Sequence, residues 1–380
     1  MIPFNKASIT EVEKKYILDC LNTNHVCGDN KYTKMVDEKL KKEFNLRALL
    51  MTSCSHALDI TAIIENFEKG DEIICPSYTF VSTANAFVLK GAIPKFVEID
   101  PKTLNIDASK IEEAISKKTK AIYVVHYAGV ACDMDKIMEI AKKYHLIVVE
   151  DAAQAFGAYY KGKLLGTIGD YGTYSFHDTK NITMGEGGAL IVKDDKKFEI
   201  AEIVREKGTN RKQYFKGFVD KYTWKMPGTS YLPSDILAAL LYGQLERFED
   251  IQQKRLKIWQ SYNKKLEKYE LKHLLKRPYI PDYATNNAHM YYIILPTTEK
   301  REKFINFMKE NEIITPFHYI PLHLSDVGLN YGYKEGDLPI TEDLASRLVR
   351  LPLYADMTES ELNIVLSALE NYFEEENNEN

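Results

Sequence analysis

The sequence lacks the features that would place the protein in a membrane or on a nucleic acid. No segment reaches the ~20 consecutive apolar residues that a membrane-spanning helix needs, and residues 1–5 show no basic stretch leading into an apolar run. The 55 acidic and 50 basic residues leave a net charge of −5, which provides no positive excess to hold a polyanion. We therefore expect no membrane partner and no nucleic acid partner.

The sequence also lacks paired cysteines. Its five cysteines are odd in number, and none forms a CxxC pair. This pattern is typical of reduced thiols in the cytoplasm, and it argues against a zinc site or a disulfide framework. We expect a cytoplasmic protein without a metal centre. The cysteines are Cys20, Cys27, Cys54, Cys75 and Cys132.

What the chain does have is an alternation of short β-rich runs with amphipathic stretches. This order predicts a mostly parallel sheet with helices on both faces, in which ligands gather beyond the carboxyl ends of the strands. The predicted strands are 48–51, 72–75, 94–99, 121–126, 146–149, 171–176 and 189–192, and the predicted helices are 31–44, 55–67, 79–90, 108–117 and 134–144.

The length of 380 residues exceeds the size at which one core stops growing, so a large domain and a smaller one are expected. Residues 234–269 read as one long helix that links the two. We predict domains at 1–245 and 246–380, with the N-terminal segment packing on the smaller one. The smaller domain is predicted to contain a strand at 290–295, helices at 299–310 and 341–350, and a last helix from 358 whose acidic end, 374–380, is frayed.

Two motifs carry the groups that pyridoxal phosphate (PLP) needs from its protein. Lys180, in the stretch 175–181, is an amine that can form a Schiff base with the cofactor. Asp151 follows an apolar strand, where a carboxylate is costly to bury unless a cation such as a protonated pyridine nitrogen pairs with it. Taken alone, such a lysine is more often a surface residue and such an aspartate a helix cap. Together they predict a PLP site, with Gln154 placed to bond the phenolic oxygen of the cofactor.

Small hydroxyl residues offer a cradle for the cofactor phosphate. Ser53, Cys54 and Ser55 join a strand to a helix, whose free N–H groups and dipole favour a dianion. The hydroxyl of Ser175 could serve the same phosphate, and Phe80 could stack on the pyridine ring. The plainer alternatives are an ordinary helix cap for the serines and a core position for the aromatic ring.

Combined, these motifs resemble those of the sugar-nucleotide aminotransferases (the DegT/DnrJ/StrS group), which are PLP enzymes of the type I aspartate aminotransferase fold. The similarity extends from residue 2 to residue 353 and includes 76–86, 151–154, 175–181 and 318–323. The resemblance implies a seven-stranded, mostly parallel sheet in the large domain and a smaller α+β C-terminal domain. It also implies a homodimer with its active sites at the subunit interface.

The resemblance assigns roles to matching residues. Lys180 would be the catalytic lysine and Asp151 the partner of the ring nitrogen. Gln154, Ser175, Phe80 and the turn of Ser53, Cys54 and Ser55 would complete the cofactor site, and Tyr319 and His323 would contact the sugar. Two positions depart from the family pattern: Cys54 replaces a common glycine, and Ser230 replaces the asparagine that reaches the phosphate of the neighbouring subunit.

Within the family, residues 125–132 and 205–211 are most similar to transaminases that make dTDP-4-amino-4,6-dideoxygalactose. This implies transfer of the amino group of L-glutamate to C4 of dTDP-4-keto-6-deoxy-D-glucose, which yields 2-oxoglutarate and a deoxyamino sugar for a surface glycan such as lipopolysaccharide O-antigen. Residues 205–216 are basic candidates for holding the sugar diphosphate.

Three alternatives stay open: the gluco epimer as product, amination at C3, and a non-catalytic binding or regulatory protein of the same fold. Dehydrating relatives have histidine where Lys180 stands, which counts against a dehydratase.

Overall fold

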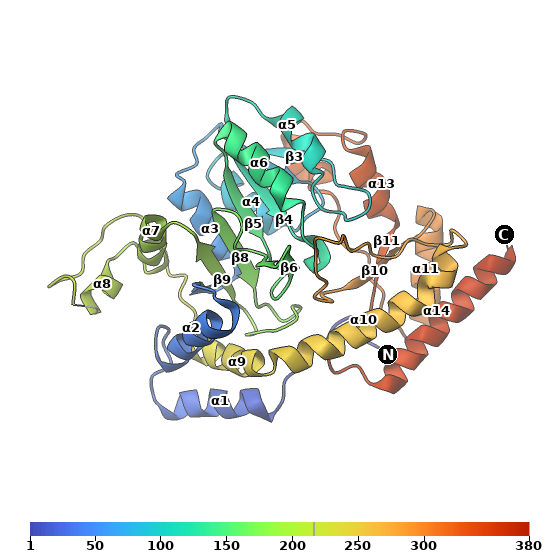
Figure 1. Cartoon of the computed structure of the whole chain (residues 1–380), viewed down its shortest axis with the longest axis horizontal. Helices are drawn as coiled ribbons and strands as arrows, with labels where there is room; N and C mark the ends of the chain where they lie inside the picture. Colours follow the sequence, from blue (N-terminus) through green and yellow to red (C-terminus); the bar gives the residue numbers. More distant parts are fainter. Residues whose placement is uncertain (216, 380) are drawn as a thin grey trace.

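The computed structural model describes residues 1–215 and 217–379 (Figure 1), and its centre is a seven-stranded sheet. The strand order is β1-β9-β8-β5-β4-β2-β3, and among the described strands of this sheet only β9 runs antiparallel to its neighbours. All the strands predicted for the large domain are present. They are β1 (Leu49–Met51), β2 (Glu72–Pro76), β3 (Ile93–Val97), β4 (Thr119–Val125), β5 (Ile147–Asp151), β8 (Tyr171–Ser175) and β9 (Gly188–Val192).

Helices cover both faces of this sheet, as the alternating pattern predicts. One face packs on α2 (Lys31–Phe44), α6 (Met134–Tyr144) and α9 (Asp235–Glu246). The other packs on α3 (Cys54–Ile64), α4 (Val81–Val88) and α7 (Asp195–Arg205). Because both faces are buried, the strands are nearly continuous apolar runs and do not alternate with polar residues.

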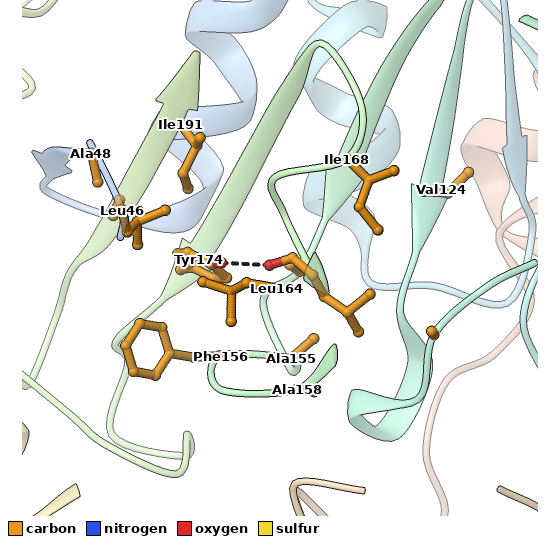
Figure 2. Packing of buried hydrophobic residues seen from close by; sticks show 14 of the residues in the cluster. Leu46, Ala48, Val124, Ala155, Phe156, Ala158, Leu164, Ile168, Tyr174 and Ile191 are labelled. Atoms are coloured by element: carbon orange, nitrogen blue, oxygen red, sulfur yellow. Dashed lines mark hydrogen bonds between the residues drawn. The ribbon is translucent and has the colours of Figure 1, made fainter. Parts of the chain in front are cut away.

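Aromatic packing on the first face fixes the segment that follows β5 (Figure 2). The rings of Phe156 and Tyr174 meet edge to face with their centroids 5.2 Å apart, and the Tyr174 hydroxyl donates a hydrogen bond to the Leu165 carbonyl. Full burial of one such side chain contributes roughly 1.5–3 kcal/mol. The segment after Asp151 is therefore held firmly against the sheet.

The neighbouring acids Glu150 and Asp151 face opposite sides of the sheet, because successive residues of a strand alternate. Glu150 is completely buried and accepts hydrogen bonds from the backbone N–H groups of Gly166, Ile168 and Gly169 at 2.6–2.8 Å. His126 donates from Nε2 to the same carboxylate at 2.8 Å. Glu150 is thus fully satisfied, while Asp151 points to the face that carries α3 and α4.

The predicted single helix over 234–269 is wrong, because the structure divides it into α9 and α10 (Phe248–Glu270) at Arg247. Arg247 donates to Glu13 at 2.7 Å and to the Ser8 carbonyl at 3.2 Å, which ties the break to α1 (Glu11–Asn22). Gly243 does not interrupt α9. A Cβ there would lie 3.0 Å from the Glu13 Cα, so glycine permits the close approach of α1.

A two-stranded sheet forms the C-terminal part, where β10 (Tyr291–Ile294) pairs antiparallel with β11 (Leu348–Leu351). Its apolar cluster also includes α10, α11 (Thr298–Glu310) and α14 (Glu359–Glu379), and α10 and α14 run side by side (Figure 1). The predicted helix 341–350 is wrong at its end: α13 (Pro339–Arg347) stops before β11, because Val349 and Leu351 are buried in the sheet pairing.

The acidic C-terminal segment is not frayed as predicted, because the helix continues to Glu379. Glu374 pairs with Lys268 at 2.9 Å, and Glu376 lies 2.7 Å from both Lys300 and Lys303. These ion pairs hold the last described turns against α10 and α11. Asn380, the end of the predicted frayed segment, lies outside the described residues.

The remaining described elements are short. They are η1 (Ala108–Lys110), α5 (Ile111–Ala114), η2 (Tyr127–Gly129), β6 (Tyr159–Tyr160), β7 (Lys163–Leu164), α8 (Arg211–Phe215), η3 (Leu322–Leu324) and α12 (Asp326–Asn330). Across residues 1–215 and 217–379, no helix combines the length and the apolar character needed to cross a membrane.

The predicted division into domains 1–245 and 246–380 stays a prediction. It falls beside Arg247, the residue between α9 and α10. Ile2 forms a parallel bridge with Ile313 and belongs to the apolar cluster of the C-terminal part. The N-terminal segment thus lies against the part of the chain that we expect to be the smaller domain.

Candidate active site

The functional residues predicted from the sequence converge at one edge of the sheet. Strands β1, β2, β5 and β8 run in the same direction, so the segments that follow them meet beyond their carboxyl ends. A cavity of 540 Å³ opens there. Its walls include Ser53, Cys54, Ser55, Phe80, Asp151, Gln154, Ser175, Lys180 and Tyr319.

Asp151 is a buried carboxylate with spare capacity for a cation. Its Oδ2 accepts a hydrogen bond from the Thr83 hydroxyl at 2.7 Å, and its Oδ1 accepts from the Ala153 N–H at 3.1 Å. Burial raises its pKa, and these two hydrogen bonds act in the opposite direction. Within the described residues no side-chain cation forms an ion pair with it. A protonated ring nitrogen in the cavity would relieve this cost.

Lys180 lies in the same cavity on the segment between β8 and β9. Burial lowers the pKa of its amine, and the positive charge of Arg350 lowers it further, while Cys54 and Asp151 act against this shift. A lowered pKa leaves more of the amine uncharged near neutral pH, which favours its attack on an aldehyde. The residue types needed for a Schiff base and for a ring-nitrogen partner therefore line one cavity.

The turn before α3 forms the phosphate side of the site. Ser53 is the N-cap of this helix and accepts a hydrogen bond from the His56 N–H at 3.1 Å, and the Ser55 hydroxyl lies 2.6 Å from that of Ser82. Gly188 allows β9 to pass closely, since a Cβ there would lie 2.5 Å from the Cys54 nitrogen. The positive end of the helix dipole suits an anion at this position.

Aromatic and amide groups form another part of the cavity wall. Gln154 accepts a hydrogen bond from the Ala128 N–H at 2.6 Å and donates to the Tyr319 hydroxyl at 3.0 Å. Tyr319 stacks on His318 with ring centroids 3.6 Å apart. Phe80 is 56% exposed, with its ring centroid 6.2 Å from that of Tyr319, so one of its faces is open to a ligand. The site roles predicted for these residues stay predictions.

The structure places two predicted site residues elsewhere. His323 is 0% exposed and is not among the described residues that line the cavity. Its ring bonds Ser77 at 2.7 Å and Glu342 at 2.9 Å, so direct contact with the sugar is not supported. In this single chain, the backbone of Ser230 forms an isolated antiparallel β-bridge with Glu206, and Ser230 is not among the described residues that line the cavity. Whether it reaches a neighbouring subunit stays a prediction.

Within the described residues 205–215, the basic side chains do not offer free cations to a diphosphate. Arg205 is buried and bonds Asp29 with both carboxylate oxygens at 2.8–2.9 Å. Lys207 and Arg211 pair with Glu206, and Lys212 pairs with Glu202. Lys216 lies outside the described residues.

Sequence reasoning missed four residues of the site: Thr83, His289, His318 and Arg350. The last three line the cavity, and Thr83 supports Asp151 from α4. Thr83 and His318 stood in the motifs 76–86 and 318–323, but neither was singled out as a site residue. Arg350 was hidden in a segment predicted to be helical.

The residues of the cavity fit PLP, since a buried, unpaired carboxylate and an amine of lowered pKa share it with a helix N-terminus. The fold around them is the type I fold of PLP enzymes. The protein is a PLP-dependent sugar-nucleotide aminotransferase. It belongs to the DegT/DnrJ/EryC1/StrS aminotransferase family, whose model matches residues 7–370.

Relatives match along nearly the whole chain. An uncharacterized protein of Methanocaldococcus jannaschii is 36% identical over 378 residues, which cover 97% of this chain and 96% of that protein. GDP-perosamine synthase of Escherichia coli O157:H7 is 31% identical over 377 residues, covering 98% of each chain. The PMP form of a protein described as sugar aminotransferase Spr1654 of Streptococcus pneumoniae superposes with a TM-score of 0.92 and 25% identity, covering 99% of this chain and 100% of that one.

Proposed function

We propose that the protein transfers the amino group of L-glutamate to C4 of dTDP-4-keto-6-deoxy-D-glucose, giving dTDP-4-amino-4,6-dideoxy-D-galactose and 2-oxoglutarate. The main support for amino transfer is that Lys180 and Asp151 line one cavity. The choice of sugar rests on the resemblance of residues 125–132 and 205–211.

In this proposal the bound cofactor supplies an electron sink for the bond that is broken at the amino donor. Lys180 takes the α-proton of the donor with its uncharged amine and later returns a proton. Asp151 keeps its negative charge beside the ring nitrogen and so holds a proton there. Thr83 and the Ala153 N–H fix the direction of that carboxylate.

A GDP-linked sugar is a second candidate substrate. GDP-perosamine synthase of E. coli matches this chain over 377 residues, and a protein of the same name in Caulobacter vibrioides matches it over 373. These relatives do not share the dTDP-sugar assignment drawn from residues 125–132. The nucleotide therefore has to be tested directly.

Purified protein loaded with PLP should be incubated with L-glutamate and with dTDP- or GDP-linked 4-keto-6-deoxy sugars in parallel. Our proposal predicts turnover of the dTDP sugar, and the proton couplings at C4 in the product NMR spectrum should report an axial amine. An equatorial amine would identify the gluco epimer. Turnover of the GDP sugar alone, or of a 3-keto sugar supplied in a parallel incubation in place of the 4-keto sugars, would overturn the proposed substrate.

We expect Arg350 to bind a carboxylate of glutamate. Its Nε and Nη2 donate to the Phe317 carbonyl at 3.2 and 2.8 Å, its guanidinium lies over the Phe4 ring, and no described carboxylate pairs with it. Arg350→Gln should raise the KM for glutamate roughly tenfold or more and leave the KM for the sugar unchanged. Arg347→Gln, which changes the last residue of α13 just before β11, is the matched control. Equal KM values for glutamate in both variants would contradict this role.

We also propose that two copies of the chain form the working enzyme. Residues 211–215 and 217–228 extend away from the sheet (Figure 1), and this arm exposes 75% of Phe218 and 72% of Trp224. Tyr214 and Tyr222 on the same arm are also exposed, and exposed aromatic residues that gather in one region are typical of a surface covered by a partner. Light scattering should therefore give twice the mass of the 43.7 kDa chain. A monomeric mass for the active protein would exclude the contribution expected from Ser230 of a neighbouring subunit.

A further inference from the structure

His289, which lies two residues before β10, is held by a network of amide groups near Lys180. Its Nδ1 lies 2.9 Å from Oδ1 of Asn181, the residue that follows Lys180. Its backbone N–H donates to Asn287 at 3.0 Å. Because His289 lines the same cavity as Lys180, the remaining ring nitrogen, Nε2, decides what the imidazole can do there.

The hydrogen bonds of Asn181 fix the tautomer of this imidazole. The Asn181 Nδ2 donates to the carbonyl of Asn287 at 2.7 Å, and a carbonyl oxygen can only accept. The other atom of the amide, Oδ1, must therefore face His289 as an acceptor. It follows that Nδ1 of His289 carries the proton, and that Nε2 of the neutral ring has a free lone pair.

The surroundings keep the ring neutral. Burial lowers the pKa of His289 well below its ordinary value, and the charged and titratable groups around it, Lys180, Arg255, His318 and Arg350, all lower it further. Arg255 lies directly behind, donating to the carbonyls of Ala288 and His289 at 3.1 and 2.6 Å. Burial and these positive neighbours together disfavour an imidazolium.

We propose that His289 is a positioning residue for Lys180: its Nε2 accepts a hydrogen bond from the free Lys180 amine and directs it for proton transfer. Both side chains line the same cavity, and the hydrogen bond to Asn181 anchors the His289 ring beside the residue that directly follows Lys180. The inference rests on the proposed function only in taking Lys180 as the reacting amine. It does not depend on which sugar accepts the nitrogen.

Two substitutions separate the two ring nitrogens. His289→Gln keeps an acceptor near the position of Nε2 and loses the bond to Asn181, whereas His289→Asn keeps a donor near Nδ1 and loses the acceptor. In cofactor-free protein, the pH dependence of Lys180 modification by an amine-reactive reagent, followed by peptide mass spectrometry, gives the pKa of Lys180. An acceptor stabilises the protonated amine, so His289→Asn should lower this pKa by about one unit and His289→Gln should leave it near the wild-type value.

When the PLP-bound variants react with L-glutamate alone, His289→Asn should again differ more from wild type than His289→Gln does. We expect the rate to fall about tenfold in His289→Asn and to change little in His289→Gln. A structural role through Asn181 predicts the reverse order. Equal Lys180 pKa values in the two variants, or a raised pKa in His289→Asn, would overturn the proposal.

Nitrogen-15 NMR of histidine-labelled wild-type protein tests the same claim if either variant fails to fold. The expected spectrum at neutral pH shows His289 protonated at Nδ1 only. Protonation at Nε2, or at both nitrogens, would remove the acceptor and overturn the proposal. Because the Lys180 titration and this spectrum need no sugar, failure of the proposed substrate leaves both results readable.

Discussion

Replacing Lys180 by alanine should lower turnover by about a thousandfold or more, because the variant loses both the group that bonds the cofactor and the base that moves the proton. The loss should appear in kcat with glutamate and sugar at saturating concentrations. Steady-state release of 2-oxoglutarate measures it, and the visible absorbance of the protein reports whether the cofactor is still covalently attached.

The matched control is Lys163→Ala, which removes an exposed lysine of β7 and should leave turnover unchanged. Circular dichroism should show the same secondary structure in both variants, since neither lysine contributes to the buried apolar clusters. Wild-type turnover in Lys180→Ala would eliminate this lysine as the reacting group and with it the proposed chemistry.

Replacing Asp151 by asparagine should have two opposite effects. Turnover should fall about a hundredfold or more, because the neutral amide no longer holds a proton on the ring nitrogen of the cofactor. The cofactor-free protein, in contrast, should become more stable near neutral pH, because burial raises the pKa of Asp151 and the charged carboxylate is disfavoured in the folded state.

The pH dependence of that stability follows from the direction of the shift. Since the pKa of Asp151 is higher in the folded than in the unfolded chain, its contribution to stability is fully present below the ordinary value of 3.8 and is lost as pH rises through the folded value. Thermal unfolding of cofactor-free protein should therefore show a gap between Asp151→Asn and wild type that widens from acid to neutral pH. PLP should narrow this gap by supplying the cation.

Asp170→Asn is the comparison variant. This aspartate accepts a hydrogen bond from the Val148 N–H at 2.8 Å at the opposite end of β5, so its replacement should affect stability without a specific loss of catalysis. A similar fall in kcat for both variants, or a less stable cofactor-free Asp151→Asn, would mean that Asp151 serves the fold and not the cofactor.

The sequence predicted the large sheet well because its strands are buried on both faces and therefore stand out as apolar runs. The cofactor-site residues could be found for a related reason, since Asp151 and Ser175 are the last residues of β5 and β8 and Ser53 follows the end of β1. In a parallel sheet such positions meet in space whatever their distance along the chain.

Residue type says nothing about the direction in which a side chain points. The sugar contact expected of His323 stays a prediction, and the His323 ring bonds Ser77 and Glu342 in this chain. The segment ending at Arg350 carried helical periodicity, and only pairing with β10 makes it a strand. The helix α1 was missed although Thr10 and Glu13 form a capping box, a signal that was present in the sequence.

The two consecutive acids at the end of β5 also set how tightly this strand is constrained in evolution and in engineering. The Glu150 carboxylate is hydrogen-bonded to the backbone of the 166–169 loop, whereas the Asp151 carboxylate has no cationic partner among the described residues. Adding or deleting one residue within β5 would move each acid to the other face of the sheet. Glu150 would then face the cofactor site, and Asp151 would be buried on the face that now holds Glu150. Length changes in this strand should therefore be among the least tolerated in the chain.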